Sequence, residues 1–486
     1  MAQPIKNAGE HIASLRDDSS VFIDGAPAGD VTEHAAFRNS IRTAASLYDY
    51  QADPANAEAM TFESPTSGRR VNRAWQMPES YEDLVTRRKA LVYWAEQHGG
   101  FMGRSPDHLA SAVTGQLMGL DMFEAHDKDR AKAFWDYYVY ARDNDLFLTY
   151  VIINPQVDRS KSASELGNDD PMLKIVDEDS AGVTVRGAKM LGTSSIMANE
   201  VFVAHLQPLR PDEVDYAVCF AMPMATEGLK VLSRKSYEQH AVSDFDNPLS
   251  ARYDENDALM FFDDVKVPWD RIFVHRDPDM CRRQFHDTPG HIYQNYHAQI
   301  RLTVKLNFLV GLAREVCETI GTVKLPPVAA ALCKMAAQAA AVENMMWGME
   351  AKGSQWGKYF VPDRHAVYAA QTLPQEYYPI MINTLRELAG GALIMLPSST
   401  EDLDHPELAA IAESVQVSAD GRNAKDRIKM MKLVWDAVGS EFAGRHTQYE
   451  MFYAGAQFVT RGHSFRTYDW EKSAALIRTI TDRYGQ

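Results

Sequence analysis

The sequence predicts an α+β fold in which a central β-domain lies between two helical domains. Three observations predict it: helical periodicity from Thr32 to about Asp145, short β-branched and aromatic runs after Leu146, and renewed helical periodicity after about His291. Because the strands cluster and do not alternate with helices, a doubly wound nucleotide-binding sheet is not expected. We therefore expect a helical domain over residues 1–144, a β-domain over 145–277 and a helical bundle over 278–486.

In the first domain, Ser80 with Asp83 three residues on is a start signal for a helix that runs to His98 and stops at Gly99. Two further helices are expected, from Asp107 to about Phe123 and from Lys128 to about Asn144. The strand-like runs of the second domain are LFLTYVIINP, GVTVRGAKM, EVFVAHL, YAVCFAMP and ALMFFDDVKVPW, which predict an antiparallel β-domain. In the third domain the helices are expected at 292–320, 328–352, 375–388 and 424–435.

The composition is that of a large folded protein with an acidic surface. The chain has 486 residues, 45% of them hydrophobic, and 50 Lys and Arg against 66 Asp and Glu give a formal charge of −16. Such a field repels phosphate backbones and anionic headgroups, so neither nucleic acid nor membrane is expected as a partner. The N-terminus has no apolar signal core, and the four cysteines form no CxxC pair. We therefore expect a cytoplasmic protein without a disulfide framework or a thiolate metal cage.

The first stretch that could carry chemistry is MGRSPDH, which ends at His108. Asp107 or Ser105 could cap the following helix, with Arg104 and His108 at its start. A helix N-terminus beside an arginine suits an oxyanion. An ordinary cap with a surface arginine explains the spacing equally well.

Two further stretches carry polar groups next to predicted strands. Tyr150 lies on a strand that leads into Gln156, Asp158 and Arg159, which can present donors and a charge to a polar heterocycle. A loop salt bridge around Asp158 is the alternative. The hydroxyls and backbone N–H groups of Gly192–Ser195 could bind a heterocycle or a phosphate, although turn chemistry alone also explains them.

The fourth stretch contains His286, His291 and His297. His297, Arg301 and Lys305 follow at i, i+4 and i+8 and share one helix face. One of the histidines could be a general base, because an unperturbed pKa of about 6.5 suits proton transfer near neutrality. A metal site is disfavoured because no HExxH or paired carboxylate accompanies them, and ordinary core or surface histidines remain an alternative.

Taken together, several stretches resemble the large component of two-component, reduced-flavin-dependent aromatic monooxygenases, the 4-hydroxyphenylacetate 3-hydroxylase family. They are MGRSPDH, INPQVDRS, GAKMLGTSS, NPLSARYDENDALMFFDDVKVPWDRI, GGALIMLPSS and WDAVGSEFAGRHTQYEMFYAG. The stretches HDTPGHIYQNY and HTQYEMFYAGAQFVTRGHSFRTYDW look most like the chlorophenol and nitrophenol 4-monooxygenase branch. The resemblance implies an acyl-CoA-dehydrogenase-like fold assembled as a homotetramer.

The resemblance also implies an activity. In this family a separate NAD(P)H:flavin reductase supplies FADH2, O2 forms a C4a-hydroperoxyflavin, and the ring carbon of a phenol attacks it. No nicotinamide need bind, which fits the absence of a GxGxxG motif. The branch implies oxygen delivery to the para carbon with release of halide or nitrite, a dehalogenation or denitration in aromatic catabolism. The alternative is ortho-hydroxylation of a 4-hydroxyphenyl acid such as 4-hydroxyphenylacetate to a catechol.

By resemblance, His291 is the base and Arg104 the cation that holds the phenolate oxygen, with His108 a second candidate for the base. His108 and Tyr150 stand where phenylacetate hydroxylases of the family carry Tyr and His, which favours a halophenol or nitrophenol substrate. The flavin site implied by the motifs comprises Gln156, Asp158, Arg159, Thr193 and Ser194, completed by 454–457 with Gln457.

Two competing interpretations are disfavoured. The 4-hydroxybutyryl-CoA dehydratases share the implied fold but need three cysteines and a histidine for an iron–sulfur cluster. Here no cysteine lies near Arg104 or His108, and Cys317 is the nearest one after His291. A scaffold role gives no reason to retain these polar residues together.

Overall fold

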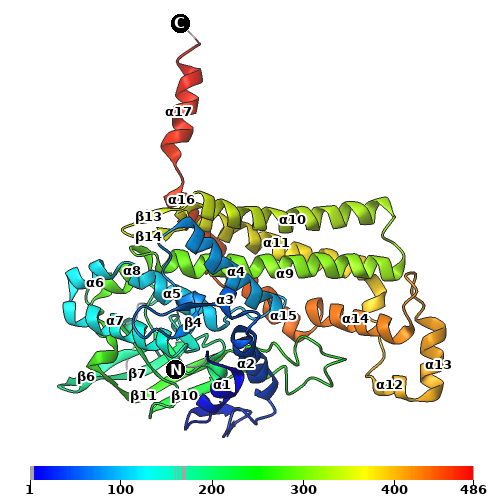
Figure 1. Cartoon of the computed structure of the whole chain (residues 1–486), viewed down its shortest axis with the longest axis horizontal. Helices are drawn as coiled ribbons and strands as arrows, with labels where there is room; N and C mark the ends of the chain where they lie inside the picture. The colour runs from blue at the N-terminus through cyan, green and yellow to red at the C-terminus, as the bar shows by residue number, and fades with distance from the viewer. Residues whose placement is uncertain (1–4, 159, 162–163, 167–170, 485–486) are drawn as a thin grey trace.

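The structure of the protein is a computed structural model, which describes residues 5–158, 160–161, 164–166 and 171–484. Helices fill both ends of the sequence and sheets its middle, so the predicted helical, β, helical order is confirmed. Figure 1 shows the sheets below the long helices α9, α10 and α11, which lie side by side along the top of the molecule. The site described below lies where these layers meet.

In the first part of the chain, the described residues form seven α-helices and four short strands. Their bounds are α1 Ala8–Ser14, β1 Ser20–Ile23, β2 Ala26–Pro27, α2 Arg38–Ala52, α3 Ala57–Met60, β3 Thr61–Glu63, β4 Arg70–Asn72, α4 Tyr81–Gln97, α5 Pro106–Leu117, α6 Leu120–His126 and α7 Lys128–Asp143. Ser80 and Asp83 form the predicted capping box of α4. The single helix expected from Asp107 is broken into α5 and α6 at Gly119, which caps α6.

The described residues of the β-region form one six-stranded and one four-stranded sheet, ordered β2-β1-β10-β11-β7-β6 and β12-β9-β8-β5. The bounds are β5 Leu148–Val151, β6 Lys174–Asp179, β7 Gly182–Met190, β8 Glu200–Val203, β9 Val218–Pro223, β10 Leu229–Ser233, β11 Ala258–Pro268 and β12 Ile272–His275. Hydrophobic side chains of both sheets and of α2 pack into one core.

The sheets are not wholly antiparallel, which corrects the sequence prediction. β1 pairs with β10 and β5 pairs with β8 in parallel, whereas the other pairs among the described strands are antiparallel. Parallel neighbours need long connections. Helices α2 to α7 lie between β1 and β10 in the sequence, and β5 meets β8 only after the chain has built β6 and β7 in the other sheet.

The last part of the chain is the helical bundle. Its elements are α8 Pro278–His286, α9 Gly290–Ile320, α10 Pro326–Ala351, β13 Ser354–Trp356, β14 Tyr359–Val361, α11 Arg364–Ala389, α12 Glu401–Asp404, α13 Pro406–Val415, α14 Ala424–Val438, α15 Glu441–Phe452, α16 Gln457–Thr467 and α17 Trp470–Thr481. Helix α11 begins well before the predicted Gln375, because Asp363 caps it and Pro374 is accommodated inside it.

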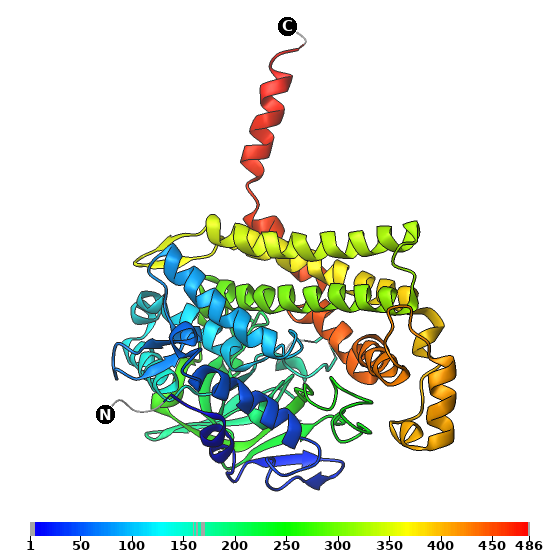
Figure 2. The same cartoon turned by 45° about the vertical axis from the view of Figure 1, so that its right-hand side comes forward.

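Helix α17 projects away from the body of the protein (Figure 2). None of its residues is buried, and Leu476, Ile477 and Ile480 are each more than half exposed. Among the described residues, no helix is both long enough and apolar enough to cross a bilayer.

Candidate active site

Helices α5 and α9 cross so closely that polar side chains on them meet. A Cβ atom on Gly115 would lie 2.8 Å from the Pro289 carbonyl oxygen, and one on Gly290 would lie 2.5 Å from Gln116 Cγ. Only glycine permits this approach at both positions. Every residue of α5 is buried, so His108 near its start lies in the interior against α9.

Arg104 lies just before α5, between two tyrosine rings. Its guanidinium carbon is 5.2 Å from the ring centre of Tyr150 and 5.1 Å from that of Tyr449, and Nη1 donates a 2.7 Å hydrogen bond to Tyr449 Oη. Gly103 leaves room for Tyr449, because a Cβ there would come within 2.5 Å of that ring. Burial raises the pKa of Tyr150, and Arg104 opposes this shift. The result is a cation held in an aromatic, half-buried setting, which suits an aromatic anion.

His108 and Tyr150, the predicted substrate contacts, are adjacent. Their rings stack with centroids 5.7 Å apart and 19° between the planes. His108 Nδ1 lies 3.0 Å from His297 Nδ1, and His297 Nε2 lies 3.1 Å from Asp107 Oδ1. Burial and then Arg104 push the pKa of His108 well below its usual value, so this imidazole is neutral. From the sequence, Asp107 was expected only as a possible helix cap and His297 only as one of three candidate bases, and no link of either to His108 was predicted.

His291 lies in a different cluster. Its Nδ1 is 3.0 Å from Tyr368 Oη, and its ring centre is 4.7 Å from that of His286 and 5.2 Å from that of His463. Burial lowers the pKa of His291 well below its usual value, and the two neighbouring histidines add to this. His291 therefore contacts side chains of α11, α8 and α16. Arg104, His108 and Tyr150 contact one another in a separate group.

Thr193 and the carboxylate of Asp257 are linked at the centre of a charged group. Asp257 accepts a hydrogen bond from Thr193 Oγ1 at 2.6 Å, from Arg445 Nη2 at 2.7 Å and from Arg234 Nε at 2.9 Å. Burial alone would raise the pKa of Asp257, but Arg445 and Arg234 hold it well below its usual range. The β-region is thereby joined to α15.

Glu255 connects the same group to Arg104. It accepts the Arg104 backbone N–H and, at 2.9 Å, Arg445 Nη1, while its carbonyl accepts the Ser194 backbone N–H at 2.8 Å. These roles of Glu255 and Arg445 were missed, although both lie inside stretches quoted for the family resemblance. Residue spacing gave no sign that the acidic run before β11 would meet α15.

Among the described residues, the other predicted flavin contacts Gln156, Asp158 and Gln457 form no hydrogen bond or ion pair with this group. Asp158 is exposed, accepts hydrogen bonds from Ser160 and lies 3.7 Å from Lys161 Nζ, which is the predicted loop salt bridge. Gln156 is also exposed, and Arg159 lies outside the described residues. Gln457 is half-buried at the start of α16. Within the described part of the chain, no group of three or more His, Cys, Asp or Glu side chains is placed to hold a metal ion.

Comparison with known proteins assigns the chain to a family. Residues 7–274 match the family described as 4-hydroxyphenylacetate 3-hydroxylase N terminal, and residues 281–482 match its C terminal counterpart. The chain belongs to the 4-hydroxyphenylacetate 3-hydroxylase family. The family predicted from the motifs is therefore confirmed.

Relatives cover nearly the whole chain. The 4-hydroxyphenylacetate 3-monooxygenase oxygenase component of Pseudomonas aeruginosa is 34% identical over 94% of this chain and 88% of that protein. The 4-nitrophenol 2-monooxygenase oxygenase component of Rhodococcus sp is also 34% identical, with the same coverage. A crystal structure of HpaB, the oxygenase component of 4-hydroxyphenylacetate 3-monooxygenase, with FAD and 4-hydroxyphenylacetate matches with a TM-score of 0.92 and 31% identity over 98% of each chain.

The fold extends beyond this family. A 4-hydroxybutyryl-CoA dehydratase from N. maritimus matches with a TM-score of 0.88 at 21% identity, over 99% of this chain and 96% of that one. The family resemblance implied that the 4-hydroxybutyryl-CoA dehydratases share this fold, and the match agrees with that expectation. At this identity the match concerns the fold alone.

Proposed function

We propose that the chain is the oxygenase component of a two-component monooxygenase that hydroxylates phenols with reduced FAD and O2. One observation carries the proposal: Arg104, held against the rings of Tyr150 and Tyr449, lies beside the neutral His108. Nε2 of His108 has no hydrogen-bond partner in the part of the chain that the structure describes. A cation for a phenolate oxygen and an acceptor for its proton are thus adjacent. Family membership supports the same reaction.

The residues around Thr193 fit a flavin. The buried hydroxyls of Ser194 and Ser195 have no hydrogen-bond partner among the described residues, and the guanidinium groups of Arg234 and Arg445, both bonded to Asp257, lie nearby. Hydroxyl donors suit a polar ring or a pyrophosphate. Reduced FAD, when bound, supplies the electrons that activate O2.

We assign FAD binding to the residues predicted from the motifs. These are Gln156, Asp158, Arg159, Thr193, Ser194 and Gln457. Thr193 and Ser194 have the strongest support, because both are buried and tied to the Asp257 and Glu255 group.

The chain's own contribution is to ionise and orient the phenol. Arg104 binds the phenolate oxygen through a charge-assisted hydrogen bond. A phenolate pushes electron density to its ortho and para carbons, and a general base contributes about 10²–10⁴-fold. The family resemblance favours His291 as this base, whereas the contacts of Arg104 and Tyr150 favour His108.

Two positions of hydroxylation are in contention. The names of the relatives place the new hydroxyl ortho to the existing one, on 4-hydroxyphenylacetate or on 4-nitrophenol, which supports ortho-hydroxylation to a catechol. Para attack with release of chloride or nitrite is supported by His108 and Tyr150, which replace the Tyr and His expected of a phenylacetate hydroxylase. The chlorophenol and nitrophenol branch remains part of the proposal on this ground.

The test supplies chemically reduced FAD and O2 with 4-chlorophenol, 4-nitrophenol, phenol or 4-hydroxyphenylacetate. Catechol formation is measured together with chloride and nitrite release. Ion release supports para attack, and catechols without ion release support ortho attack. Formation of H2O2 alone with every phenol would reject the proposed function.

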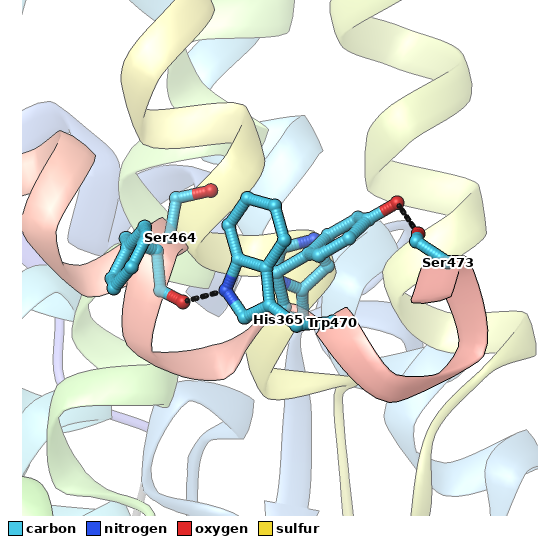
Figure 3. Close-up of a pocket in the computed structure, with 6 residues that line it drawn as sticks. His365, Ser464, Trp470 and Ser473 are labelled. Atoms are coloured by element: carbon cyan, nitrogen blue, oxygen red, sulfur yellow. Dashed lines mark hydrogen bonds between the residues drawn. The ribbon is translucent and has the colours of Figure 1, made fainter. Parts of the chain in front are cut away.

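We further propose a homotetramer served by a separate NAD(P)H:flavin reductase in the cytoplasm, where the four free cysteines would stay reduced. The relatives' names as oxygenase components support the separate reductase. Helix α17 supports assembly, because a helix of 12 residues is marginal alone in water and this one exposes an apolar face. At its base, residues of α11, α16 and α17 line a cavity of about 440 Å³ (Figure 3).

Removal of the chain beyond Thr467 tests the assembly. We expect the mass measured by light scattering to fall from four chains to fewer. An unchanged mass would remove α17 from the interface.

A further inference from the structure

A chain of polar contacts ends at His108. Ser105 Oγ donates to Asp107 Oδ1 at 2.5 Å, Asp107 Oδ1 lies 3.1 Å from His297 Nε2, and His297 Nδ1 lies 3.0 Å from His108 Nδ1. We call these four residues the His108 relay. Each is only 2% exposed. At its end, His108 Nε2 has no hydrogen-bond partner among the described residues.

The carboxylate end of the relay fixes the tautomer of each imidazole. Burial alone would raise the pKa of Asp107, but His297 and Ser105 hold it below its usual value, so Asp107 is an acceptor. His297 therefore carries its hydrogen on Nε2 and presents a lone pair at Nδ1. His108 donates Nδ1–H to that lone pair, which leaves His108 Nε2 unprotonated and able to accept a proton.

The charges around the relay favour movement of a proton away from His108. Arg104 from the segment before α5 and Arg301 from α9 both oppose a positive charge on His108. Tyr150 from β5, stacked on His108, is kept neutral by burial. His98 from the end of α4 faces Asp107, and burial lowers the pKa of His98 to about 3, so this imidazole is neutral as well. Asp107 Oδ1 lies 3.1 Å from His297 Nε2, so this carboxylate can pair with a positive charge on the His297 ring.

We propose that His108 accepts the proton of the phenol, and that Asp107 and His297 orient His108 and take up the proton that it releases from Nδ1. This inference rests on the proposed function. The phenol O–H bond breaks and an N–H bond forms at His108 Nε2. The Nδ1 proton of His108 then passes to Nδ1 of His297, which becomes an imidazolium paired with Asp107. The phenolate charge is left beside Arg104. One proton moves and no oxidant is consumed, so His108 is the catalytic residue, and Asp107 and His297 are positioning residues.

The experiment compares a weakly acidic phenol with one that ionises by itself. The variants His108→Gln, His297→Gln and Asp107→Asn are assayed with chemically reduced FAD on phenol and on 4-nitrophenol, at a pH where free 4-nitrophenol is ionised. His463→Gln, a histidine variant outside the relay, is the control. We expect the relay variants to lose about 10²–10⁴-fold on phenol, the usual contribution of a general base. On 4-nitrophenol they should keep most of the wild-type rate.

A second measurement needs no turnover. The absorbance of 4-nitrophenol bound to the full chain reports its ionisation as pH is varied. We expect the wild type to lower the apparent pKa of the bound phenol and each relay variant to return it toward that of free 4-nitrophenol. A purely structural role of His297 or Asp107 would not move this value.

Ser105→Ala is a milder change, because it removes only the hydrogen bond from Ser105 to Asp107. It tests the relay even if the other variants fail to fold. It should shift the pKa of the bound phenol in the same direction by less. The proposal is overturned if the relay variants keep the wild-type ratio of rates on the two phenols, above all if His291→Gln alone loses the rate on phenol. If the wild type hydroxylates no phenol, the proposed function has failed, and the ionisation measurement still tests the relay.

Discussion

Two histidine clusters at the start of α9 differ in their partners. In the His108 relay, His297 is paired with the carboxylate of Asp107, and Arg104 lies next to the terminal histidine. In the second cluster, which we call the His291 cluster, His291 meets the neutral hydroxyl of Tyr368 and the rings of His286 and His463. A histidine works as a base when a partner stabilises the charge it acquires. On this ground we propose His108, whose relay contains a carboxylate, as the base in preference to His291.

Helix geometry explains why the two clusters are separate. His291 and His297 are six residues apart, which is roughly 9 Å along the axis and about 240° around it. The two side chains therefore leave α9 in different directions. His297 turns toward α5, and His291 turns toward α11 and α16.

Apart from the relay variants themselves, the largest expected effect belongs to Arg104, the cation beside the His108 relay. Arg104→Gln should lower kcat/KM for phenols by about 10²–10³-fold, because it removes the donor that faces the developing oxyanion. Arg104→Lys should recover part of the loss, since it restores the charge without the planar guanidinium. Steady-state hydroxylation rates measure both. Wild-type activity in Arg104→Gln would show that Arg104 does not bind the phenolate oxygen, and the His291 cluster would be the next candidate for that site.

A matched pair of tyrosine variants compares the two clusters directly. Tyr150 stacks on His108 and lies under Arg104, whereas Tyr368 is bonded to His291. Tyr150→Ala should therefore lower kcat/KM for phenol far more than Tyr368→Ala. Thermal melting of both variants separates this effect from loss of stability. The reverse order of rates would assign the chemistry to the His291 cluster.

The glycine at the α5 and α9 crossing tests the packing that aligns the relay. Gly115→Ala should destabilise the protein by about 1–3 kcal/mol, because the new methyl group would lie against the backbone at Pro289. Gly311→Ala in α9 is the control, since nothing lies within 4 Å of its added Cβ. That variant should be more stable by about 0.5–1 kcal/mol. Denaturant unfolding measures both changes, and equal effects would contradict the close crossing.

The smallest effect concerns pH and the His291 cluster. Burial lowers the pKa of both His286 and His463 from 6.5 to about 4. Between these values the unfolded chain binds more protons than the folded protein, so the free energy of unfolding should fall as pH falls from about 6.5 toward 4. His463→Gln should flatten this dependence. Unfolding curves at several pH values measure the slope, and an identical slope in the variant would contradict the assignment.

Much of the fold could be predicted from the sequence. The capping box at Ser80 and Asp83 and the strand alternation of GVTVRGAKM are local signals, and the structure has α4 and β7 where they predict them. The parallel pairing of β5 with β8 was missed because it is a choice between distant strands. The early start of α11 was missed because Pro374, normally a helix breaker, lies inside it.

For the site, the sequence by itself determined the chemical types present and the family: Arg104, His108 and Tyr150 were named, and the structure brings them together. Only the tertiary structure decided which histidine lies next to a carboxylate, namely His297 beside Asp107. His108 and His297 are 189 positions apart, and they meet because α5 and α9 cross at two glycines. Periodicity specifies which face of a helix a side chain occupies, but its partner depends on which other element packs there, and that is fixed by burial across the whole core.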